Sequence, residues 1–494
     1  MRHTILHVLL FALVCVSAKA EQTNIVLLMG DDHGWEETGY NDHPFLQTPV
    51  LDEMAKSCLR LDRFYAAHPS CSPTRGSVMT GRHPNRYGTF APNWSIRPQE
   101  ITIAHLLNRA GYQCGHFGKW HLGPVKAYSP TNPGVMGFHE WLSHDNFFEL
   151  NPQFSRNGGP PEKFQGESSE ILIDQTIQFI DKAIKNDKPF FTVVWFGSPH
   201  QPYSGLDKDL ALYDDLPQKY ANKKVKVTSN ETGNQTKRPL RDVLRERYAE
   251  ITAMDRSIGT LRTALKQRGV KDKTLIWYCG DNGTPADGQA EPPLRGAKGQ
   301  MYEGGIRVPG LIEWPERIAK PRTSDLISAT TDMLPTLCSV AKIPLPGRTL
   351  DGVDLLPLID GEINERPKPL FFWSYGGTTP ANAKPWIEPE LQVGTTPLVK
   401  LMNGKPTRTF RNFHQSTIGQ DDFRGSRVAM SNQYKLVITG RGDKEKHQLF
   451  ELKVDPAETN DLSQTKPAVT RAMLQQLRQW QESVLASLQG GDYQ

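Results

Sequence analysis

Cysteine is scarce in this chain, which has 6 among its 494 residues. So few cysteines cannot form the dense disulfide framework that stabilises small extracellular domains. Long apolar runs are missing after the first twenty residues, and a bilayer span needs ~20 apolar residues, so we expect no stable membrane anchor. A large excess of one charge is missing too, because the formal net charge is only +4. This argues against nucleic acid as a partner.

The first twenty residues have the pattern of a secretory signal peptide. Arg2 precedes an apolar stretch from Ile5 to Val16, and Ala18-Lys19-Ala20 is a small-x-small cleavage pattern. We therefore predict that residues 1–20 are removed and that the protein is exported. Its destination would be the periplasm or the exterior of a bacterium, or the lysosome or exterior of an animal cell.

The cysteines that follow the signal peptide are odd in number: Cys58, Cys71, Cys114, Cys279 and Cys338. In an exported protein an odd number implies at least one thiol that is free or chemically modified. Cys71 is our candidate for that thiol. The other four could pair in three ways, and the sequence does not choose among them.

Three apolar runs end in polar residues. Residues 24–29 lead to Asp31 and Asp32, residues 190–196 lead to Ser198-Pro199-His200, and residues 274–278 lead to Asp281-Asn282-Gly283. Amphipathic helices are predicted between these strands, over 169–185 and 244–265. Strands that alternate with helices indicate an α/β fold, with a mostly parallel central sheet flanked by helices. The polar strand ends should then meet at one edge, where such sheets bind ligands.

The pattern changes after about residue 369. Four short strands, near 371–373, 427–430, 434–438 and 448–452, precede a helix over 467–488. We predict a large N-terminal catalytic domain over residues 21–368 and a smaller α+β subdomain over 369–494 with an antiparallel sheet. Segments 216–238 and 378–425 are predicted to be surface loops or insertions.

Cys71 is predicted to lie at the start of a helix. Pro73 suits a first helical turn because its missing N–H would have no partner there, and Arg75 to Thr80 can continue the helix. Backbone N–H groups and the helix dipole favour an anion at such a position. Residue 71 would therefore lie where an anion, or a nucleophile that becomes negative, is stabilised.

Several separated motifs resemble those of the type I, formylglycine-dependent sulfatases of the alkaline phosphatase-like superfamily. They are Cys71-Ser72-Pro73-Thr74-Arg75 with Gly81-Arg82, Gly118-Lys119-Trp120-His121-Leu122-Gly123, Ser198-Pro199-His200, Asp281-Asn282-Gly283, and Gly296-x-Lys298. The resemblance implies that a maturation enzyme oxidises Cys71 to Cα-formylglycine (3-oxoalanine). The hydrate of that aldehyde would be the nucleophile that attacks sulfate esters.

The resemblance also implies roles for the other catalytic residues. Arg75 and Lys119 would hold the formylglycine hydrate, and Lys298 would contact the sulfate oxygens. His121 would bond a hydroxyl of the hydrate and later help to deprotonate it. His200 would contact the sulfate and protonate the leaving oxygen.

A metal site is indicated by the residue types alone. Asp31, Asp32, Asp281 and Asn282 are an all-oxygen set, which suits Ca²⁺ or Mg²⁺ better than zinc. The resemblance favours Ca²⁺, and we place residue 71 among the ligands. Asn282 also begins an Asn-x-Thr sequon, but a metal ligand cannot carry a glycan. Asn93, Asn230 and Asn234 begin sequons that are freer to do so.

The substrate is expected to be a sulfated small molecule or a sulfated polysaccharide such as a glycosaminoglycan. Basic and aromatic residues in the loops near 124–166, 201–240 and 378–425 could hold a sulfated sugar: Lys223, Lys224, Lys226, Lys237, Lys400, Lys405, Arg408, Arg411, Tyr203, Trp386 and Phe410. Three alternatives stay open here. They are a formylglycine-dependent phosphonate or phosphodiester hydrolase, a sulfamidase, and an inactive carbohydrate-binding relative with an unmodified Cys71.

Overall fold

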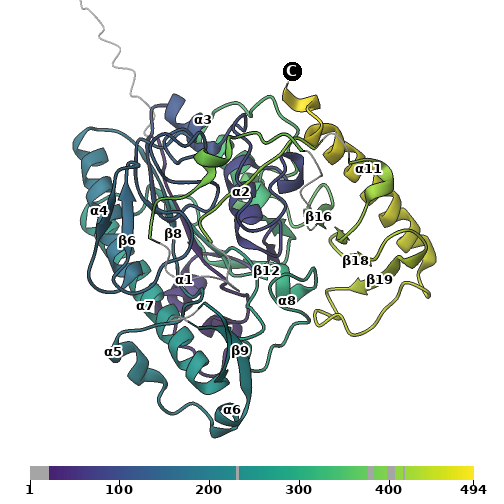
Figure 1. Ribbon diagram of the computed structural model, residues 1–494, viewed down its shortest axis with the longest axis horizontal. Helices are drawn as coiled ribbons and strands as arrows, with labels where there is room; N and C mark the ends of the chain where they lie inside the picture. Colours follow the sequence, from purple (N-terminus) through teal and green to yellow (C-terminus); the bar gives the residue numbers. More distant parts are fainter. Residues whose placement is uncertain (1–21, 230–232, 376–382, 398–406, 416–417, 494) are drawn as a thin grey trace, which may run out of the picture.

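A ten-stranded sheet forms the centre of the computed structural model (Figure 1), which describes residues 22–229, 233–375, 383–397, 407–415 and 418–493. The predicted signal peptide lies outside the described residues. The strand order is β14-β2-β13-β11-β1-β8-β4-β5-β6-β7. The strands are β1 (Asn24–Gly30), β2 (Leu59–Leu61), β4 (Gln113–Lys119), β5 (Glu140–His144), β6 (Gln153–Arg156), β7 (Pro161–Lys163), β8 (Phe190–Trp195), β11 (Thr274–Gly280), β13 (Gly310–Glu313) and β14 (Arg322–Ser324).

The central strands of this sheet are parallel, as the sequence predicts. Strand β1 pairs in parallel with β11 on one side and β8 on the other, and the parallel order continues through β4 to β5. The pairs at both margins, β11 with β13 and β5 with β6, are antiparallel. The carboxyl ends of five neighbouring strands therefore lie along one edge of the sheet.

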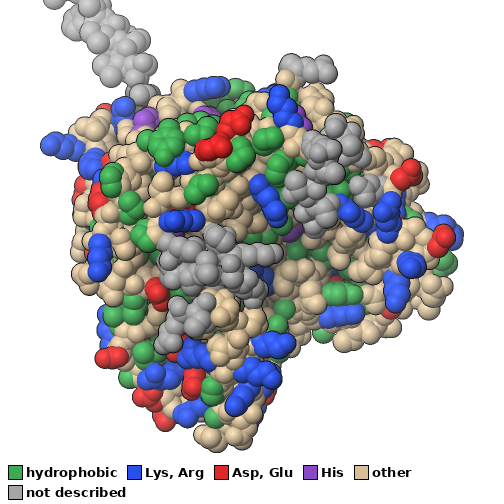
Figure 2. Space-filling model, viewed as in Figure 1, with side chains coloured by type: hydrophobic (Ala, Val, Ile, Leu, Met, Phe, Trp, Pro, Cys, Tyr) green, Lys and Arg blue, Asp and Glu red, His purple; other side chains and the backbone are tan. Residues whose placement is uncertain are grey.

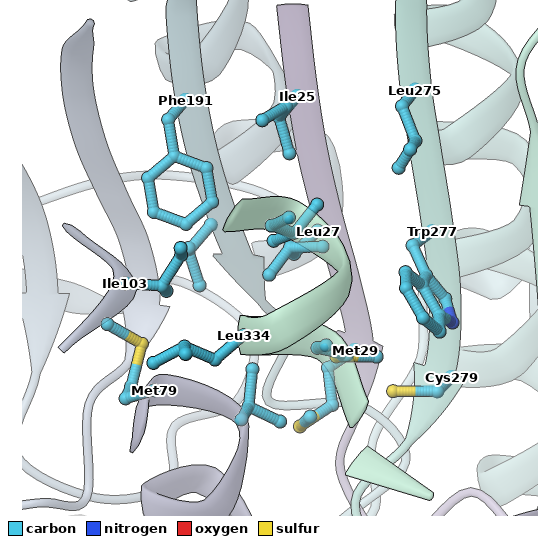
Figure 3. Close-up of a cluster of buried hydrophobic side chains, with 14 of the residues drawn as sticks. Ile25, Leu27, Met29, Met79, Ile103, Phe191, Leu275, Trp277, Cys279 and Leu334 are labelled. Carbon is cyan, nitrogen blue, oxygen red and sulfur yellow. The ribbon is translucent and has the colours of Figure 1, made fainter. Parts of the chain in front are cut away.

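Helices cover both faces of the sheet, so the residues of its central strands are buried on both sides. Ile25, Leu27 and Met29 pack with α2, α3 and α9 on one face (Figure 3), while Val26 and Leu28 pack with α1, α4 and α7 on the other. These helices are α1 (Pro49–Ser57), α2 (Cys71–Thr80), α3 (Ile103–Arg109), α4 (Ser168–Lys185), α7 (Leu240–Gln267) and α9 (Met333–Ala341). The predicted helices over 169–185 and 244–265 are confirmed as α4 and α7.

The C-terminal region forms a second, antiparallel sheet in the order β16-β17-β18-β19. Its elements are β16 (Leu370–Ser374), β17 (Ser426–Met430), β18 (Tyr434–Thr439), β19 (Lys446–Glu451) and α11 (Pro467–Leu488). Helix α11 packs on one face of this sheet, and the other face packs against residues of the larger part of the chain (Figure 1). The predicted α+β character and antiparallel sheet are confirmed.

Short elements complete the fold. They are α5 (Asp207–Leu210), α6 (Gln218–Asn222), α8 (Glu303–Ile306), α10 (Leu356–Ile359), a small sheet of β3 (Phe64–Tyr65), β12 (Arg307–Val308) and β15 (Ser328–Ala329), and a hairpin of β9 (Lys224–Thr228) and β10 (Gln235–Pro239). None of the helices in the described part of the chain has the length and hydrophobicity that crossing a membrane requires.

Of the two alternatives predicted for 216–238, a surface loop or an insertion, the loop is wrong, because this segment contains α6 and most of the β9–β10 hairpin. The sequence signal was present: Val225 and Val227 alternate with lysines, and Val227 is buried against Tyr203 and Val243. In the other predicted loop, the described parts of 378–425 contain only two short 3₁₀ helices and isolated bridges.

The sequence left the pairing of the cysteines open, and the structure shows no disulfide among the described residues. The five cysteines are all buried free thiols: Cys58, Cys71, Cys114, Cys279 and Cys338.

A buried lysine connects the C-terminal sheet to the larger part of the protein. The ammonium of Lys435, on β18, lies 2.9 Å from a carboxylate oxygen of Glu303, on α8, and 2.9 Å from one of Glu458. Burial alone would lower the pKa of Lys435, but the two carboxylates raise it. We expect Lys435→Ala to lower the free energy of unfolding by about 3–5 kcal/mol, because it leaves Glu458 buried without its cation and Glu303 with only the more distant Arg307, at 3.8 Å.

Urea unfolding of the purified protein measures this change. Lys453→Ala is the control, because the Lys453–Asp325 pair is more than half exposed and such pairs contribute about 0–1 kcal/mol. Equal effects of the two substitutions would contradict the structural role of Lys435.

Candidate active site

The predicted polar strand ends come together at the carboxyl edge of the parallel strands. Asp31 and Asp32 follow β1, His200 follows β8, and Asp281 follows β11. The ligand atoms of Asp31, Asp32, Cys71 and His200 all lie within 4.8 Å of one another, and all four residues are buried. Lys119, the last residue of β4, bonds Asp31, and Lys298 bonds Asp32. The structure thus gathers residues that are up to 267 positions apart, Asp31 and Lys298 being the extremes of this set.

Two local backbone features position these side chains. Asp32 has φ 64°, in the left-handed region, so the chain turns sharply as β1 ends. At Gly283 an added Cβ would lie 1.9 Å from the carbonyl oxygen of Gly304. Only glycine therefore lets the chain after Asn282 pass this close to helix α8.

Cys71 is the first residue of helix α2, which confirms the predicted placement at a helix start. The N-cap residue, Ser70, makes no side-chain hydrogen bond to the helix, and Gly81 ends it in a left-handed conformation with φ 68°. The thiol lies 4.0 Å from Oδ1 of Asp32 and is 2% exposed. Burial raises the pKa of the Cys71 thiol to about 12. An unmodified Cys71 is therefore protonated at neutral pH and is a poor nucleophile.

Four oxygen-bearing side chains form the candidate metal site. Asp31, Asp32, Asp281 and Asn282 are at most 3% exposed. Oδ1 of Asp31 and Oδ1 of Asn282 are buried without a hydrogen-bond partner among the described residues. Burial and the nearby charge of Asp31 raise the pKa of Asp281. A hard divalent cation fits this set, because it would use the unpartnered oxygens and relieve the repulsion between the carboxylates.

Three cations surround these carboxylates. Nζ of Lys119 lies 2.6 Å from Oδ2 of Asp31, and Nζ of Lys298 lies 2.6 Å from Oδ1 of Asp32. Nη2 of Arg75 lies 2.8 Å from Asp281 and 3.4 Å from Asp31. Burial alone would raise the pKa of Asp31, but Lys119 and the other cations hold it well below its usual range. The site therefore keeps charges of both signs away from water.

The two predicted catalytic histidines are both buried and are held through opposite ring nitrogens. Nδ1 of His200 lies 2.6 Å from the carbonyl oxygen of Gln201, and its ring stacks on Phe147 at a centroid distance of 4.9 Å. Nε2 of His121 lies 2.8 Å from Oδ1 of Asn93. Burial lowers the pKa of His200 to about 3 and places that of His121 well below its usual value.

Arg247, on α7, is a site residue that the sequence reasoning missed. Its guanidinium donates to the carbonyl oxygens of Asp32, at 2.5 Å, and Pro199, at 2.6 Å, and pairs with Glu37. It therefore holds the chain after β1 against the chain after β8. A signal was available, since Arg247 lies three residues after Leu244 and four before Ile251, on the apolar face of the helix. A charged residue at such a position is buried and needs partners.

Asn93 was interpreted as the start of a free sequon, but the structure places its amide in the site, where it bonds His121 and Asn146. Among the expected substrate-binding residues, the ring of Phe410 lies 6.1 Å from that of His121. Lys223, Lys224, Lys226 and Lys237 are exposed on or beside the β9–β10 hairpin. Figure 2 shows Lys and Arg side chains gathered over the lower part of the molecule, where Figure 1 labels β9. Tyr203 is buried and bonds Asp287. Lys400 and Lys405 lie outside the described residues.

Known proteins resemble this chain along most of its length. The model of the family described as Sulfatase matches residues 23–343. Human arylsulfatase A is 32% identical over 411 residues, which covers 74% of this chain and 73% of that protein. N-acetylgalactosamine-6-sulfatase of Mus musculus is 30% identical, with coverages of 75% and 72%. The crystal structure of Ps i-CgsB in complex with k-i-k-neocarrahexaose has a TM-score of 0.73 at 23% identity, covers 93% of this chain and 92% of that one, and shows the fold.

Divalent cations are expected to stabilise the protein. At a concentration about 100-fold above Kd, a bound cation adds about 2.7 kcal/mol, which raises Tm by several degrees. Asn282→Leu should remove most of this rise, because it replaces an unpartnered ligand oxygen by a methyl group. Thermal unfolding with calcium chloride, magnesium chloride or a chelator measures the effect.

The control variant is Asn222→Leu, at an exposed position on α6. It should keep the full shift in Tm. A shift that persists undiminished in Asn282→Leu would place the cation elsewhere.

Proposed function

This chain belongs to the sulfatase family and hydrolyses sulfate esters, and on that premise we propose that its nucleophile is a Cα-formylglycine made from Cys71. The observation that carries the proposal is the setting of Cys71. Residue 71 is the first residue of helix α2, and although burial raises the pKa of its side chain, the positive charges of Lys119 and Lys298 act to lower it. A helix N-terminus with cations nearby favours a negative charge on residue 71, which an aldehyde hydrate could supply.

Oxidation of Cys71 by a maturation enzyme would supply an aldehyde hydrate, with one hydroxyl to attack sulfur and a second to release the sulfate by C–O cleavage. Arg75 and Lys119 are the residues that would hold this hydrate. The guanidinium of Arg75 donates to Asp281 at 2.8 Å and to the carbonyl oxygen of Lys119 at 3.2 Å. These bonds hold Arg75 and Lys119 next to each other. Their positive charge would favour the deprotonated hydroxyl.

We assign the metal ligands to Asp31, Asp32, Asp281 and Asn282, together with residue 71, and we propose Ca²⁺ as the ion. When bound, the cation would neutralise part of the sulfate charge and polarise its S–O bonds. The ammonium of Lys298 lies 2.7 Å from Oδ2 of Asp32 and would contact the sulfate oxygens. The site would thus offer positive charge on several sides of one sulfate group.

His200 would deliver the proton to the leaving oxygen. Its Nδ1 donates to the carbonyl oxygen of Gln201, so Nε2, which lies 3.7 Å from Asp32, is the nitrogen that can take up and release a proton. The negative charge of a sulfate ester beside Nε2 would favour the protonated ring. His121 would act on the hydroxyl of residue 71 and take its proton during release of sulfate.

Sulfated carbohydrates are the substrates that we propose for this chain. A relative is named N-acetylgalactosamine-6-sulfatase, and a protein of the same fold has been crystallised with k-i-k-neocarrahexaose. The exposed lysines on or beside the β9–β10 hairpin would supply charge for an anionic polymer. With the signal peptide over residues 1–20, we propose that the protein acts after export, in the periplasm or outside the cell.

Mass spectrometry of the peptide that contains residue 71 tests the nucleophile. We expect its mass to be about 18 Da below that calculated for cysteine, as conversion of a thiol to an aldehyde requires. Cys71→Ser should give at most one slow turnover, because a serine ester lacks the second hydroxyl. Peptides that contain the other four cysteines are internal controls and should keep the cysteine mass. Multiple turnovers at the wild-type rate by Cys71→Ser would overturn the aldehyde mechanism.

A panel of compounds tests the substrate class. We expect release of sulfate from sulfated oligosaccharides to have a higher kcat/KM than hydrolysis of an aryl sulfate, because the exposed lysines can contact only a longer anionic substrate. Hydrolysis of a phosphodiester, a phosphonate or a sulfamate should be slower still. Cys71→Ala is the blank for every substrate. Preference for the phosphonate would favour the alternative activity.

A further inference from the structure

We propose that Asn93 is a positioning residue for the sulfatase reaction: it fixes which ring nitrogen of His121 carries the hydrogen. The inference rests on the proposed function, because it assumes that His121 exchanges a proton during the reaction. Asn93 belongs to none of the motifs that resemble the sulfatase signatures. It lies in the chain between helices α2 and α3 and has φ 65°, in the left-handed region.

The direction of each hydrogen bond follows from one backbone carbonyl. The carbonyl oxygen of Thr407 can only accept, so the atom of Asn146 that lies 2.6 Å from it is the amide nitrogen, Nδ2. The same nitrogen lies 3.2 Å from the Asn93 side chain and donates its second hydrogen there. The Asn93 atom at this point is therefore its oxygen, Oδ1. Nε2 of His121, which lies 2.8 Å from that oxygen, must then be the donor.

A neutral imidazole carries one hydrogen, so a hydrogen at Nε2 leaves a lone pair at Nδ1. Nδ1 of His121 is buried and has no hydrogen-bond partner among the described residues. It is therefore the nitrogen that can accept a proton from the hydroxyl of residue 71. In the opposite tautomer, Nδ1 of His121 would carry the hydrogen and could not accept a proton. Its Nε2 would then present a lone pair to Oδ1 of Asn93, which is also an acceptor.

Asn93 is itself held close to the nucleophile. Its backbone N–H donates to Oγ of Ser72, the residue next to Cys71, at 3.1 Å. Its carbonyl oxygen accepts from the N–H of Arg411 at 3.1 Å, and the N–H of Ser95 donates back to Arg411 at 3.0 Å. The backbone of Asn93 is thus held between the first turn of α2 and the segment that contains Arg411. Its backbone N–H contacts α2 while its side chain contacts His121, so Asn93 connects the histidine to the start of this helix.

Kinetics of three variants tests the positioning role. We expect Asn93→Ala to lower kcat about 10²-fold, because loss of the correct tautomer of a catalytic histidine is costly. Asn93→Asp keeps an acceptor oxygen at the same place and should restore kcat to within about tenfold of wild type. The double variant Asn93→Ala with His121→Ala should be no slower than His121→Ala alone, because Asn93 acts through His121.

The outcomes separate positioning from a general structural effect. If Asn93 only supports the fold, its loss will add to that of His121→Ala, and Asn93→Ala and Asn93→Asp will be equally slow. A kcat of Asn93→Ala within twofold of wild type would also overturn the proposal. Tm values of all variants, measured in parallel, show whether a slow variant is folded.

A second measurement does not depend on activity. Nitrogen-15 NMR of histidine-labelled Cys71→Ala protein reports the tautomer of each ring, and the signals of His121 are those missing from a further His121→Gln variant. We expect a hydrogen at Nε2 of His121, and a mixture of tautomers once Asn93→Ala is added. A hydrogen at Nδ1 would overturn the proposal. The result stands apart from the proposed nucleophile, whose failure would show instead as an active Cys71→Ala enzyme.

Discussion

Three carboxylates buried at one point of the fold, those of Asp31, Asp32 and Asp281, are the constraint on which the rest of the site depends. Inside a protein such groups repel one another, and each has lost its hydration. Burial and the charge of Asp31 raise the pKa of Asp281, whereas the surrounding cations lower that of Asp31. Arg75, Lys119 and Lys298 each pair with at least one of these carboxylates, so the residues proposed to bind the hydrate and the sulfate also stabilise the folded state.

The parallel sheet makes this arrangement geometrically simple. Neighbouring parallel strands end at the same edge, so residues that follow β1, β8, β11 and β4 approach one another without any long loop to position them. Helix α2 adds residue 71 from outside the sheet. Arg75, one turn further along, reaches back to Asp281, which follows β11, and to the carbonyl oxygen of Lys119, the last residue of β4, and its guanidinium lies 5.1 Å from the ring of Trp195, on β8. The helix that begins at Cys71 is thereby fixed to three strands.

A second layer of hydrogen bonds determines what the histidines can do. His200 donates from Nδ1 to a backbone carbonyl and keeps Nε2 available, whereas His121 donates from Nε2 and keeps Nδ1 available. The two rings therefore keep different nitrogens out of these hydrogen bonds, Nε2 in His200 and Nδ1 in His121. In the same layer, Arg247 holds the carbonyl oxygens of Asp32 and Pro199, which keeps two of the strand ends at a constant separation. A sulfatase site of this kind needs such residues even though they touch no substrate.

The sequence by itself determined the class of fold, the main strands and helices, and the family to which the chain belongs. These depend on local patterns: apolar runs that end in carboxylates, a 3.6-residue repeat of isoleucines in α4, and a cysteine two residues before a proline. Tertiary structure alone decided which side chains would meet from distant positions. Arg247 lies 215 positions from Asp32, and Asn93 lies 28 from His121 and 53 from Asn146, so no local pattern relates them. In the folded protein all five described cysteines are unpaired, and the β9–β10 hairpin forms within a segment predicted as a loop. The physical reason is that hydrogen-bond direction, ion pairing and strand pairing depend on separation in space, which the chain acquires only when its core has packed.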